Sequence, residues 1–290
     1  MRVIPQNFIR KPDWLKILLR TGHNYTDLKN IVQNSKLHTV CQEALCPNIY
    51  ECWESRAATL MILGDVCTRS CGFCNVKTGR PTWQDIDEPR RIAEAVRQMG
   101  LRHCVITSVN RDELPDGGAA IWADTIQAVH ELNTECTVEV LIPDFKGDPA
   151  NLMTVFAAHP EILGHNVETI ARLYPAVRPQ ANFQQSLEVL RQSKKFGLRT
   201  KTAVMVGLGE TKAEVVETIH KIAETGCDIL ALGQYLQPTP RHHPVDRYVH
   251  PQEFDLYREI GLQYGLQWVE SGPLVRSSYH ADVQAKAQME

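Results

Sequence analysis

Six of the nine cysteines in this 290-residue chain lie between positions 41 and 74, in two closely spaced triplets. The first triplet is Cys41-x4-Cys46-x5-Cys52, and the second is Cys67-x3-Cys71-x2-Cys74. Thiolate sulfur prefers zinc, copper(I) and iron–sulfur clusters. A structural zinc site needs four ligands, whereas three cysteines suit a cubane 4Fe–4S cluster that leaves one iron open. The spacing therefore favours iron–sulfur clusters over structural zinc, with an open iron for a substrate, a cofactor or a non-cysteine ligand.

The other three cysteines stand in apolar segments. Cys104, Cys136 and Cys227 occur in HCVITSV, CTVEVLI and GCDILALG. A free cysteine in such a run behaves as a small hydrophobic residue, so we expect these three in the core. Because nine is odd, the cysteines cannot all pair in internal disulfides, and clustered thiols in a reducing compartment usually serve metal binding or catalysis. We therefore expect a cytoplasmic protein.

Composition excludes several classes of protein. The net charge is −3, which argues against a strongly basic nucleic-acid binder. No run of 18 apolar residues occurs, so we expect no membrane span. Residues 1–16 lack the apolar core of a secretory signal. An apolar content of 43% with balanced charge also excludes disorder.

From residue 59 onward, short apolar runs alternate with longer segments of helical periodicity. The predicted strands cover 59–63, 103–109, 137–142, 161–165, 201–206, 229–232 and 267–270, and the predicted helices lie near 87–99, 117–133, 149–158, 182–196, 211–224 and 251–264. This alternation is typical of a parallel α/β fold. About six units are fewer than the eight of a complete TIM barrel. We therefore predict a partial (β/α)6 TIM-type barrel, with an open doubly wound sheet as the alternative.

The chain divides into three expected segments. Residues 1–58 form an N-terminal extension with the first triplet, 59–270 form the barrel, and 271–290 form a C-terminal tail. The two extensions are far apart in sequence, and we expect them to cover the barrel opening. Functional residues of parallel α/β folds gather at the carboxyl ends of the strands. Cys67 follows the first predicted strand closely, so the second triplet is expected at the barrel mouth.

The second triplet, in CTRSCGFC after a first strand, resembles the cysteine motif of the radical S-adenosylmethionine (SAM) superfamily. The first triplet, in CQEALCPNIYECW (41–53), is similar to the second cluster motif of the lipoyl synthase family. Further segments that resemble this family are GDVCTRSCGFCNVKTGRP (64–81), TSVNRDELPDGGA (107–119), VRPQANF (177–183), TKTAVMVGLGE (200–210), LGQYLQPTPRHHPVDRYVHP (232–251) and SGPLVRSSYHAD (271–282). The resemblance covers about residues 38–283. It departs in a short N-terminal segment and in Gly164-His165, where the family has Asn-His.

The resemblance implies a role for each cluster ligand. Cys67, Cys71 and Cys74 would hold the radical SAM 4Fe–4S cluster, whose open iron would bind SAM. Cys41, Cys46 and Cys52 would hold an auxiliary 4Fe–4S cluster, with Ser278 of the RSSY segment as its fourth ligand. A serine oxygen is a harder ligand than thiolate, so it could dissociate when the cluster gives up sulfide.

The resemblance also implies the reaction and the partners. The substrate would be an octanoyl-lysine on a lipoyl carrier domain, such as the E2 subunit of a 2-oxoacid dehydrogenase or the H protein of glycine cleavage. Two sulfur atoms from the auxiliary cluster would be inserted at C6 and C8, with one SAM spent for each carbon. Ferredoxin or flavodoxin would supply electrons, and iron–sulfur carrier proteins would rebuild the auxiliary cluster. No nucleic-acid or membrane partner is expected.

Other positions become candidates for SAM binding. Phe73 could pack beside the adenine, and Gly207 and Gly209 could line the SAM side of the cavity. Thr107, Asn110 and Arg111 could hold the methionine end of SAM, Asn166 and Glu168 the ribose hydroxyls, and Arg178 the methionine carboxylate. Ordinary packing or polar capping at strand ends is the alternative for each. We expect Arg241-His242-His243 in a rim loop near the substrate or the carrier, with a plain solvated loop as the alternative. We expect Arg276 and His280 in the docking of the tail.

Three alternatives to a lipoyl synthase remain open at this point. Another radical SAM enzyme that inserts sulfur, such as a biotin synthase-like or methylthiotransferase-like protein, would share the second triplet but not the CQEALCPNIYECW and RSSY segments. A two-cluster electron carrier or scaffold would not need an α/β barrel. A zinc-bound interaction module would contain zinc and show no visible chromophore.

Overall fold

The computed structural model describes residues 10–17 and 21–289. Its main sheet contains β1 (His38–Thr39), β2 (Thr59–Ile62), β5 (His103–Ser108), β6 (Thr137–Leu141), β7 (Ile162–Gly164), β8 (Arg199–Val206), β9 (Ile229–Gln234) and β10 (Trp268–Gly272). The strands follow one another in this order, and every neighbouring pair from β2 to β10 is parallel. β1 adds an antiparallel edge to β2. A parallel order without crossings curls into a barrel that stays open between β10 and β1.

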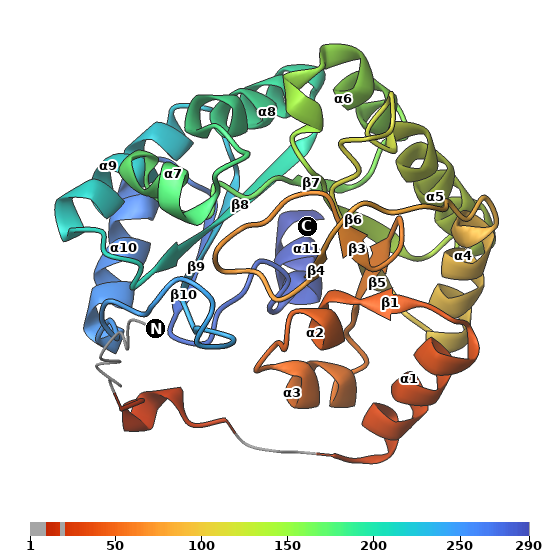
Figure 1. The fold of residues 1–290 in the computed structure, drawn as a ribbon, viewed down its shortest axis with the longest axis horizontal. Coiled ribbons are helices and arrows are strands. Elements are labelled where there is room, and N and C mark those ends of the chain that lie inside the picture. The colour runs from red at the N-terminus through yellow and green to blue at the C-terminus, as the bar shows by residue number, and fades with distance from the viewer. Residues whose placement is uncertain (1–9, 18–20, 290) are drawn as a thin grey trace, which may run out of the picture.

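Six helices follow the strands and form an outer ring around the sheet (Figure 1). They are α4 (Glu88–Met99), α5 (Ala119–Leu132), α6 (Pro149–Phe156), α8 (Phe183–Phe196), α9 (Lys212–Ala223) and α10 (Pro251–Gln263). These helices and the seven parallel strands lie where the sequence predicts them, within a few residues. The predicted partial (β/α)6 barrel is confirmed.

Local sequence signals explain several of these helix starts. The Asp148 side chain accepts hydrogen bonds from the amides of Ala150 and Asn151, and Pro149 occupies the first helical position, where it has no amide to satisfy. Thr211 and Glu214 form a reciprocal capping box at α9. Each cap satisfies amides that the first helical turn leaves unpaired.

The helices bury their apolar faces on the outside of the sheet. One core joins α4, α5 and α6 to β2, β5 and β6, and it includes Ile92, Trp122, Ile126 and Phe156. A second core joins α8, α9 and α10 to β8, β9 and β10. Cys104, Cys136 and Cys227 are buried, with 0%, 5% and 4% of their surface exposed, and Cys104 and Cys136 belong to the first core while Cys227 belongs to the second. Their predicted role as core residues is confirmed.

The N-terminal part contains helices that the sequence did not predict. These are η1 (Asp13–Leu15), α1 (His23–Asn34), α2 (Val40–Glu43) and α3 (Ile49–Glu54). Leu28 and Trp53 are fully buried, and α1 packs on both α3 and α4. Residues 1–9 and 18–20 of the expected extension lie outside the described residues. The short helices α2 and α3 were not recognised because a single turn carries too little periodicity to be read.

The C-terminal tail lies inside the barrel. Its Val275 carbonyl lies against Gly233 at the carboxyl end of β9. Its Ser278 hydroxyl accepts a 2.8 Å hydrogen bond from Thr59, which lies at the start of β2. Helix α11 (Ala281–Met289) then lies in the middle of the ring in Figure 1, where Ala285 packs against Ile162 and Ile229. The tail thus runs along the inner surface of the sheet and ends beneath the cavity.

Short elements complete the upper face of the barrel. β3 (Val66–Cys67) and β4 (Lys77–Thr78) pair as a small separate sheet, and their connecting loop crosses in front of α11 (Figure 1). η2 (Phe145–Gly147) follows β6, while η3 (Ala171–Leu173) and α7 (Tyr174–Val177) follow β7.

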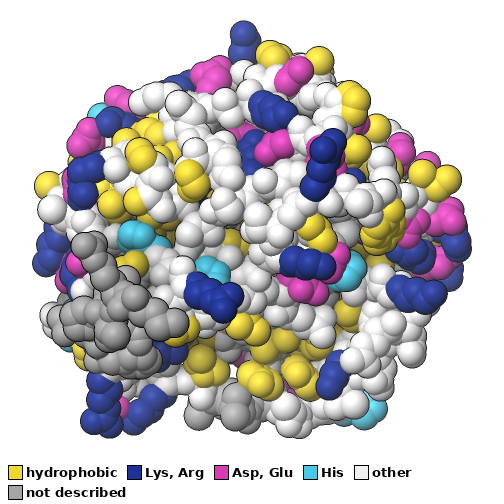
Figure 2. Space-filling view, viewed as in Figure 1, with side chains coloured by type: hydrophobic (Ala, Val, Ile, Leu, Met, Phe, Trp, Pro, Cys, Tyr) yellow, Lys and Arg dark blue, Asp and Glu magenta, His cyan; other side chains and the backbone are white. Residues whose placement is uncertain are grey.

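Within the described ranges, no helix combines the length and apolar character that crossing a bilayer requires. Figure 2 shows acidic and basic side chains interspersed on this face.

Candidate functional site

A cavity of about 510 Å³ opens at the carboxyl ends of the strands and reaches into the barrel. All six clustered cysteines line it, with Cys41, Cys46 and Cys52 in the N-terminal extension and Cys67, Cys71 and Cys74 after β2. The C-terminal tail contributes Val275 to Tyr279 to the same wall. The cavity therefore brings the two neighbouring triplets together with a distant segment of the C-terminal tail.

The loop of the second triplet is held by backbone amides that point at sulfur. The amides of Arg69 and Asn110 donate hydrogen bonds of 3.4 Å and 3.3 Å to the Cys67 Sγ atom. Burial raises the pKa of Cys71, against the opposing charge of Arg178, and raises the pKa of Cys74 to about 12. Such thiols stay protonated at neutral pH unless a metal centre supplies positive charge. Amides directed at Cys67 and neutral neighbouring thiols fit a site that is completed by an iron–sulfur cluster.

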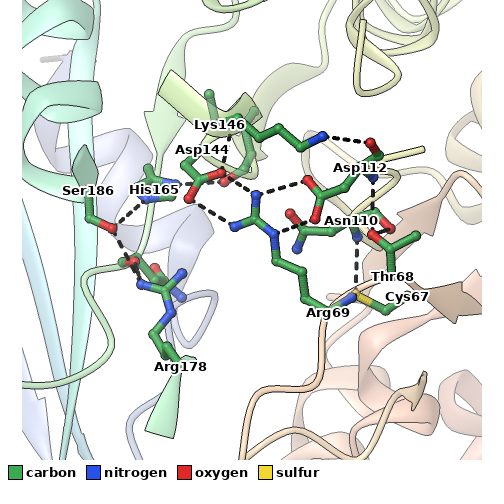
Figure 3. Close-up of polar contacts among 12 residues, drawn as sticks. Cys67, Thr68, Arg69, Asn110, Asp112, Asp144, Lys146, His165, Arg178 and Ser186 are labelled. Atoms are coloured by element: carbon green, nitrogen blue, oxygen red, sulfur yellow. Dashed lines mark hydrogen bonds and ion pairs between the residues drawn. The ribbon is translucent and has the colours of Figure 1, made fainter. Parts of the chain in front are cut away.

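Arg69 anchors this loop to two strand ends (Figure 3). Its guanidinium contacts Asp112 at 2.7 and 2.9 Å and Asp144 at 2.9 and 2.6 Å. The Arg69 side chain is 4% exposed and that of Asp144 is 0% exposed, so each charge depends on its partner. Hydrogen bonds to Arg69 hold the pKa of Asp144 well below its usual range despite burial, which alone would raise it. The pairs join the cysteine loop to the segments that follow β5 and β6.

The first triplet approaches the same cavity from the N-terminal side. Burial and the nearby Cys46 thiol raise the pKa of Cys41 to about 11, and burial with Cys41 and Cys46 raises the pKa of Cys52 further. These three thiols are thus close enough for their charges to interact. Ser278 also lines the cavity, and its Oγ accepts the hydrogen bond from Thr59. Burial raises the pKa of Cys46, and the positive charge of Arg276 opposes that rise, while burial lowers the pKa of Arg276 itself.

The N-terminal extension and the tail meet beside the first triplet. The Asn48 side chain donates to the Leu274 carbonyl at 2.7 Å, and the Tyr279 hydroxyl donates to Glu51 at 3.2 Å. Among the described residues, no three His, Cys, Asp or Glu side chains are placed to share one metal ion. The cysteine ligands of a cubane cluster bind separate iron atoms, so the wider spacing of each triplet is compatible with a cluster.

Besides Phe73, five polar residues predicted to bind SAM line the cavity: Thr107, Asn110, Asn166, Glu168 and Arg178. The Asn166 amide donates to Glu168 at 3.0 Å, and burial raises the pKa of Glu168 while Arg178 opposes that rise. Glu168 has a positive φ of 67°, an unusual backbone conformation for a residue with a side chain. These residues form a polar part of the cavity wall, in which the Asn110 amide contacts Cys67 and the Arg178 charge acts on Cys71.

Several hydrogen bonds hold the Arg178 side chain in place, but one of its donors has no partner. Its Nη1 donates to the carbonyls of Asn166 and Val167, to the Tyr174 hydroxyl and to Ser186. Its Nε is buried and has no hydrogen-bond partner among the described residues. Because an unsatisfied buried donor of a cation is costly, this group is suited to an anionic ligand in the cavity.

Three other predicted positions are placed differently. Arg111 turns away from the cavity: it donates to Glu113, to the Leu63 carbonyl and to the Trp83 carbonyl, and it lines a separate cavity beside Trp83. Gly207 and Gly209 do not line the main cavity. The amides of Gly207 and Leu208 are bonded to the Glu210 carboxylate at 2.6 and 2.9 Å, so they are not free to bind a ligand.

The glycine at 207 has a packing role. Its φ is +95°, and a Cβ there would lie 2.2 Å from Gln234 Nε2.

Phe73 lines the cavity but also packs with Leu208 and Tyr235 in a small core. His280 is exposed and faces Glu270 at 3.5 Å, whereas Arg276 lines the cavity. Both lie in the tail segment, as expected.

Sequence reasoning missed several polar residues in the cavity wall and beneath it. His165 bonds to the Ile142 carbonyl and to Ser186, and burial lowers its pKa to about 4 (Figure 3). Below the cavity, Lys201 and Glu139 form a fully buried ion pair at 2.8 Å, with His103 3.5 Å from the same carboxylate. Charged residues inside otherwise apolar strands, such as Glu139 in TVEVL and Lys201 in RTKTAVMV, were the available signal.

The barrel and the cysteine-lined mouth define a radical SAM protein, and the Radical SAM superfamily matches residues 61–222, from β2 to α9. Residues 4–46 match the N-terminal domain of lipoyl synthase. The chain is 57% identical over 278 residues to the lipoyl synthase of Rubrobacter xylanophilus, which covers 95% of this chain and 87% of that relative. It is 54% identical over 282 residues to the lipoyl synthase of Shouchella clausii, covering 96% and 91%. The chain belongs to the lipoyl synthase family.

Solved structures of lower identity share the fold. SuiB of Streptococcus suis bound to S-adenosylmethionine superposes with a TM-score of 0.58 at 10% identity, covering 77% of this chain and 53% of SuiB. Methylornithine synthase (PylB) superposes with a TM-score of 0.55 at 14% identity, covering 86% of this chain and 83% of that protein. These structures support the partial barrel assignment.

Proposed function

We propose that this member of the lipoyl synthase family inserts two sulfur atoms at C6 and C8 of a protein-bound octanoyl-lysine. The observation that carries the proposal is that both cysteine triplets and Ser278 line a single cavity. A radical centre and a sulfur source must face the same carbon, and one cavity with two thiol-lined walls provides that arrangement.

The residues divide into two proposed ligand sets. Cys67, Cys71 and Cys74 would hold the SAM-binding 4Fe–4S cluster, and Cys41, Cys46, Cys52 and Ser278 would hold the auxiliary 4Fe–4S cluster. When bound, the clusters and SAM supply a radical that can remove hydrogen from an unactivated C–H bond and a sulfide that can replace it. We further propose the division into residues 1–58, 59–270 and 271–290 as extension, barrel and tail.

The remaining side chains of the cavity would orient SAM and exclude water. The buried Nε of Arg178 would meet the methionine carboxylate, and Asn166 and Glu168 would meet the ribose hydroxyls. Thr107 and Asn110 would flank the methionine end, although Thr107 Oγ1 already donates to the Leu141 carbonyl at 3.0 Å. Phe73 would reach the adenine from the edge of its small core.

The proposed partners follow from the same chemistry. The acyl chain would be delivered by octanoylated carrier domains of 2-oxoacid dehydrogenases or of the glycine cleavage H protein. Ferredoxin or flavodoxin would supply the electrons, and iron–sulfur carriers would restore the sulfide that leaves with the product. We propose a cytoplasmic setting because six free thiols line the cavity and need a reducing compartment.

The test is an anaerobic turnover experiment. The protein is reconstituted with iron and sulfide, both are quantified, and SAM, dithionite and an octanoyl-lysine peptide are added. We expect about eight irons per chain, 5′-deoxyadenosine, and a peptide that gains two sulfur atoms by mass spectrometry. Deoxyadenosine without peptide thiolation would keep the radical SAM chemistry and reject this substrate. Two clusters without SAM cleavage would favour an electron carrier or scaffold, and zinc without a chromophore would favour an interaction module.

Variants of the two triplets test the two proposed clusters one at a time. Replacing Cys41, Cys46 and Cys52 by Ala should leave about four irons and SAM cleavage but abolish sulfur gain. Replacing Cys67, Cys71 and Cys74 by Ala should also leave about four irons but abolish SAM cleavage. The matched control is a variant of the three core cysteines, Cys104, Cys136 and Cys227, which should keep about eight irons if it folds.

A further inference from the structure

The loop between β9 and α10, residues 235–250, contains the Arg241-His242-His243 segment whose role the family assignment leaves open. It contains Pro238, Pro240 and Pro244 and no regular element. The loop is nevertheless pinned to its surroundings. The Gln234 side chain donates to the Arg247 carbonyl at 3.1 Å and accepts from the Val249 amide at 2.8 Å, and the Asp246 amide donates to the Gly207 carbonyl at 2.9 Å. A pinned loop can hold its side chains at fixed positions.

His243 connects the cysteine loop to the turn that follows β8. Its backbone amide donates to the Gly72 carbonyl of the cysteine loop at 2.8 Å. Its ring Nε2 bonds to the Leu208 carbonyl of the Gly207–Gly209 turn at 3.0 Å, and because a carbonyl only accepts, this nitrogen carries the proton. The Tyr235 hydroxyl donates to the His243 carbonyl at 2.6 Å and fixes the backbone of the residue.

His242 contacts the cysteine loop at a second point. Its Nε2 bonds to the Cys74 carbonyl at 3.0 Å, so this nitrogen is the donor. Its Nδ1 is then the acceptor, and the Thr239 hydroxyl donates to it at 2.9 Å. Both ring nitrogens are engaged, which leaves His242 no lone pair for a metal ion.

The cysteine loop, residues 67–74, also has contacts on its other side. The Gly72 amide donates to the Val177 carbonyl at 2.8 Å, directly before Arg178. A Cβ at Gly72 would lie 3.3 Å from the Ala176 carbonyl and 3.6 Å from the His243 Cβ, so the loop is closely packed on both faces. The two histidines therefore complete a clamp around residues 71–74.

We propose that His242 and His243 are positioning residues that hold the 67–74 loop in register with the Gly207–Gly209 turn and thereby set the affinity of the site for SAM. This inference rests on the proposed function, because it assumes that residues 67–74 carry the SAM-binding cluster. The histidines act through the backbone of the loop and need not contact SAM. Contacts that tie the cysteine loop to this turn preorganise the site, so their loss should weaken SAM binding more than cluster binding.

The test compares two substitutions at each histidine. The amide of Gln reaches the position of the ring Nε2, whereas the amide of Asn reaches only the position of Nδ1. We expect His243→Asn to weaken SAM binding about tenfold in the reconstituted protein and His243→Gln to restore most of that affinity. The same pattern is expected at His242, with His242→Gln closer to the parent protein than His242→Asn. His220→Asn on α9, an exposed position, is the matched control.

Two readouts other than turnover support the binding measurement. Hydrogen exchange of the metal-free protein should speed up in the peptide that covers residues 67–74 in the Asn variants and not in His220→Asn. The electron paramagnetic resonance spectrum of the reduced cluster should lose its response to SAM at concentrations that saturate the parent protein. Iron content should change little, and circular dichroism verifies folding.

The outcomes distinguish the two proposals. If the parent protein takes up no iron–sulfur cluster or does not bind SAM, the proposed function fails. If the parent binds both and all four histidine variants match His220→Asn in SAM affinity and in exchange at residues 67–74, the positioning role is rejected. If Gln and Asn variants are equally impaired, the donor at Nε2 is not the cause, and the inference is also rejected.

Discussion

Arg69 is the only cation of the 67–74 loop, and it lies between two carboxylates that come from other parts of the chain. A buried ion pair contributes little relative to an apolar core, but removing one partner leaves a charge that water cannot reach. Asp144 is the more sensitive partner because its side chain is fully buried, whereas Asp112 is 26% exposed. Arg69 thus makes the geometry of the cysteine loop depend on the ends of β5 and β6.

Replacing Arg69 with Met should lower the free energy of unfolding by about 3–5 kcal/mol, because Asp144 loses its buried counter-charge. Urea denaturation of the metal-free protein measures this change. The double variant Arg69→Met, Asp144→Asn should recover part of the loss, since the uncompensated charge is gone. A loss below about 1 kcal/mol in the single variant would show that water or another cation replaces Arg69.

His165 makes stability depend on pH. Burial, with a smaller effect of Arg178, lowers its pKa from 6.5 to about 4, so the folded protein keeps the ring neutral. The unfolded chain binds a proton near pH 6.5, so this contribution is complete above that pH and is lost as pH falls from about 6.5 to 4. The shift corresponds to about 3 kcal/mol at most.

We therefore expect the free energy of unfolding to fall between pH 6.5 and 4.5, and to fall less steeply in His165→Asn. The Asn amide keeps the donor to the Ile142 carbonyl but does not titrate. Urea unfolding at a series of pH values measures both slopes. His220→Asn should leave the slope unchanged, and equal slopes for the parent protein and His165→Asn would contradict the assignment.

At the scale of elements, the approach of the tail to β9 sets the shape of the cavity. Gly233 ends the parallel pairing with β10, and a Cβ on it would lie 2.0 Å from the Val275 carbonyl. That contact is with backbone, so no side chain can turn aside to relieve it. Gly272, its partner in β10, would place a Cβ 3.4 Å from a Val275 methyl group, which is ordinary contact.

Gly233→Ala should therefore lower the free energy of unfolding by about 1–3 kcal/mol, while Gly272→Ala should cost clearly less. The displaced tail should also loosen the wall that contains Arg276 and Ser278. Denaturation gives the stability, and hydrogen exchange in the peptide that covers residues 273–280 gives the local effect. Equal costs for the two glycines would show that the tail moves freely relative to β9.

At the scale of the molecule, α11 closes the interior of a barrel that has too few strands to fill itself. Ala285 packs against Ile162 and Ile229, Gln284 is fully buried, and the Glu139–Lys201 ion pair lies in the same interior. The tail therefore forms part of the core and also part of the cavity wall.

A chain that stops after His280 should lose about 2 kcal/mol or more of stability, because it exposes the apolar interior at the start of the strands. For a domain of this size, the melting temperature should fall by roughly 4 °C or more. Thermal unfolding followed by circular dichroism measures the shift, and a dye that binds exposed apolar surface reports the opened interior. An unchanged melting temperature without dye binding would show that α11 is dispensable for the core.

Features that depend on neighbours in sequence were predictable. The alternation of strands and helices, the caps at Asp148 and Thr211, and the burial of Cys104, Cys136 and Cys227 depend on local periodicity and composition. Each cysteine triplet also lies within a short stretch of sequence, and its three thiols line the same cavity. For these reasons, the partial barrel and the family could be inferred before the structure.

Only the tertiary structure decided which distant side chains meet. Arg69 pairs with residues 43 and 75 positions away, Arg111 turns to Glu113 instead of the cavity, and Glu210 occupies the amides of the glycine turn. No local pattern encodes these choices, because they depend on which groups the packed strands leave buried and in need of a partner. The sequence by itself determined the strands and helices of the barrel, the two cysteine triplets and the family, whereas packing determined the polar network and the path of the tail through the barrel.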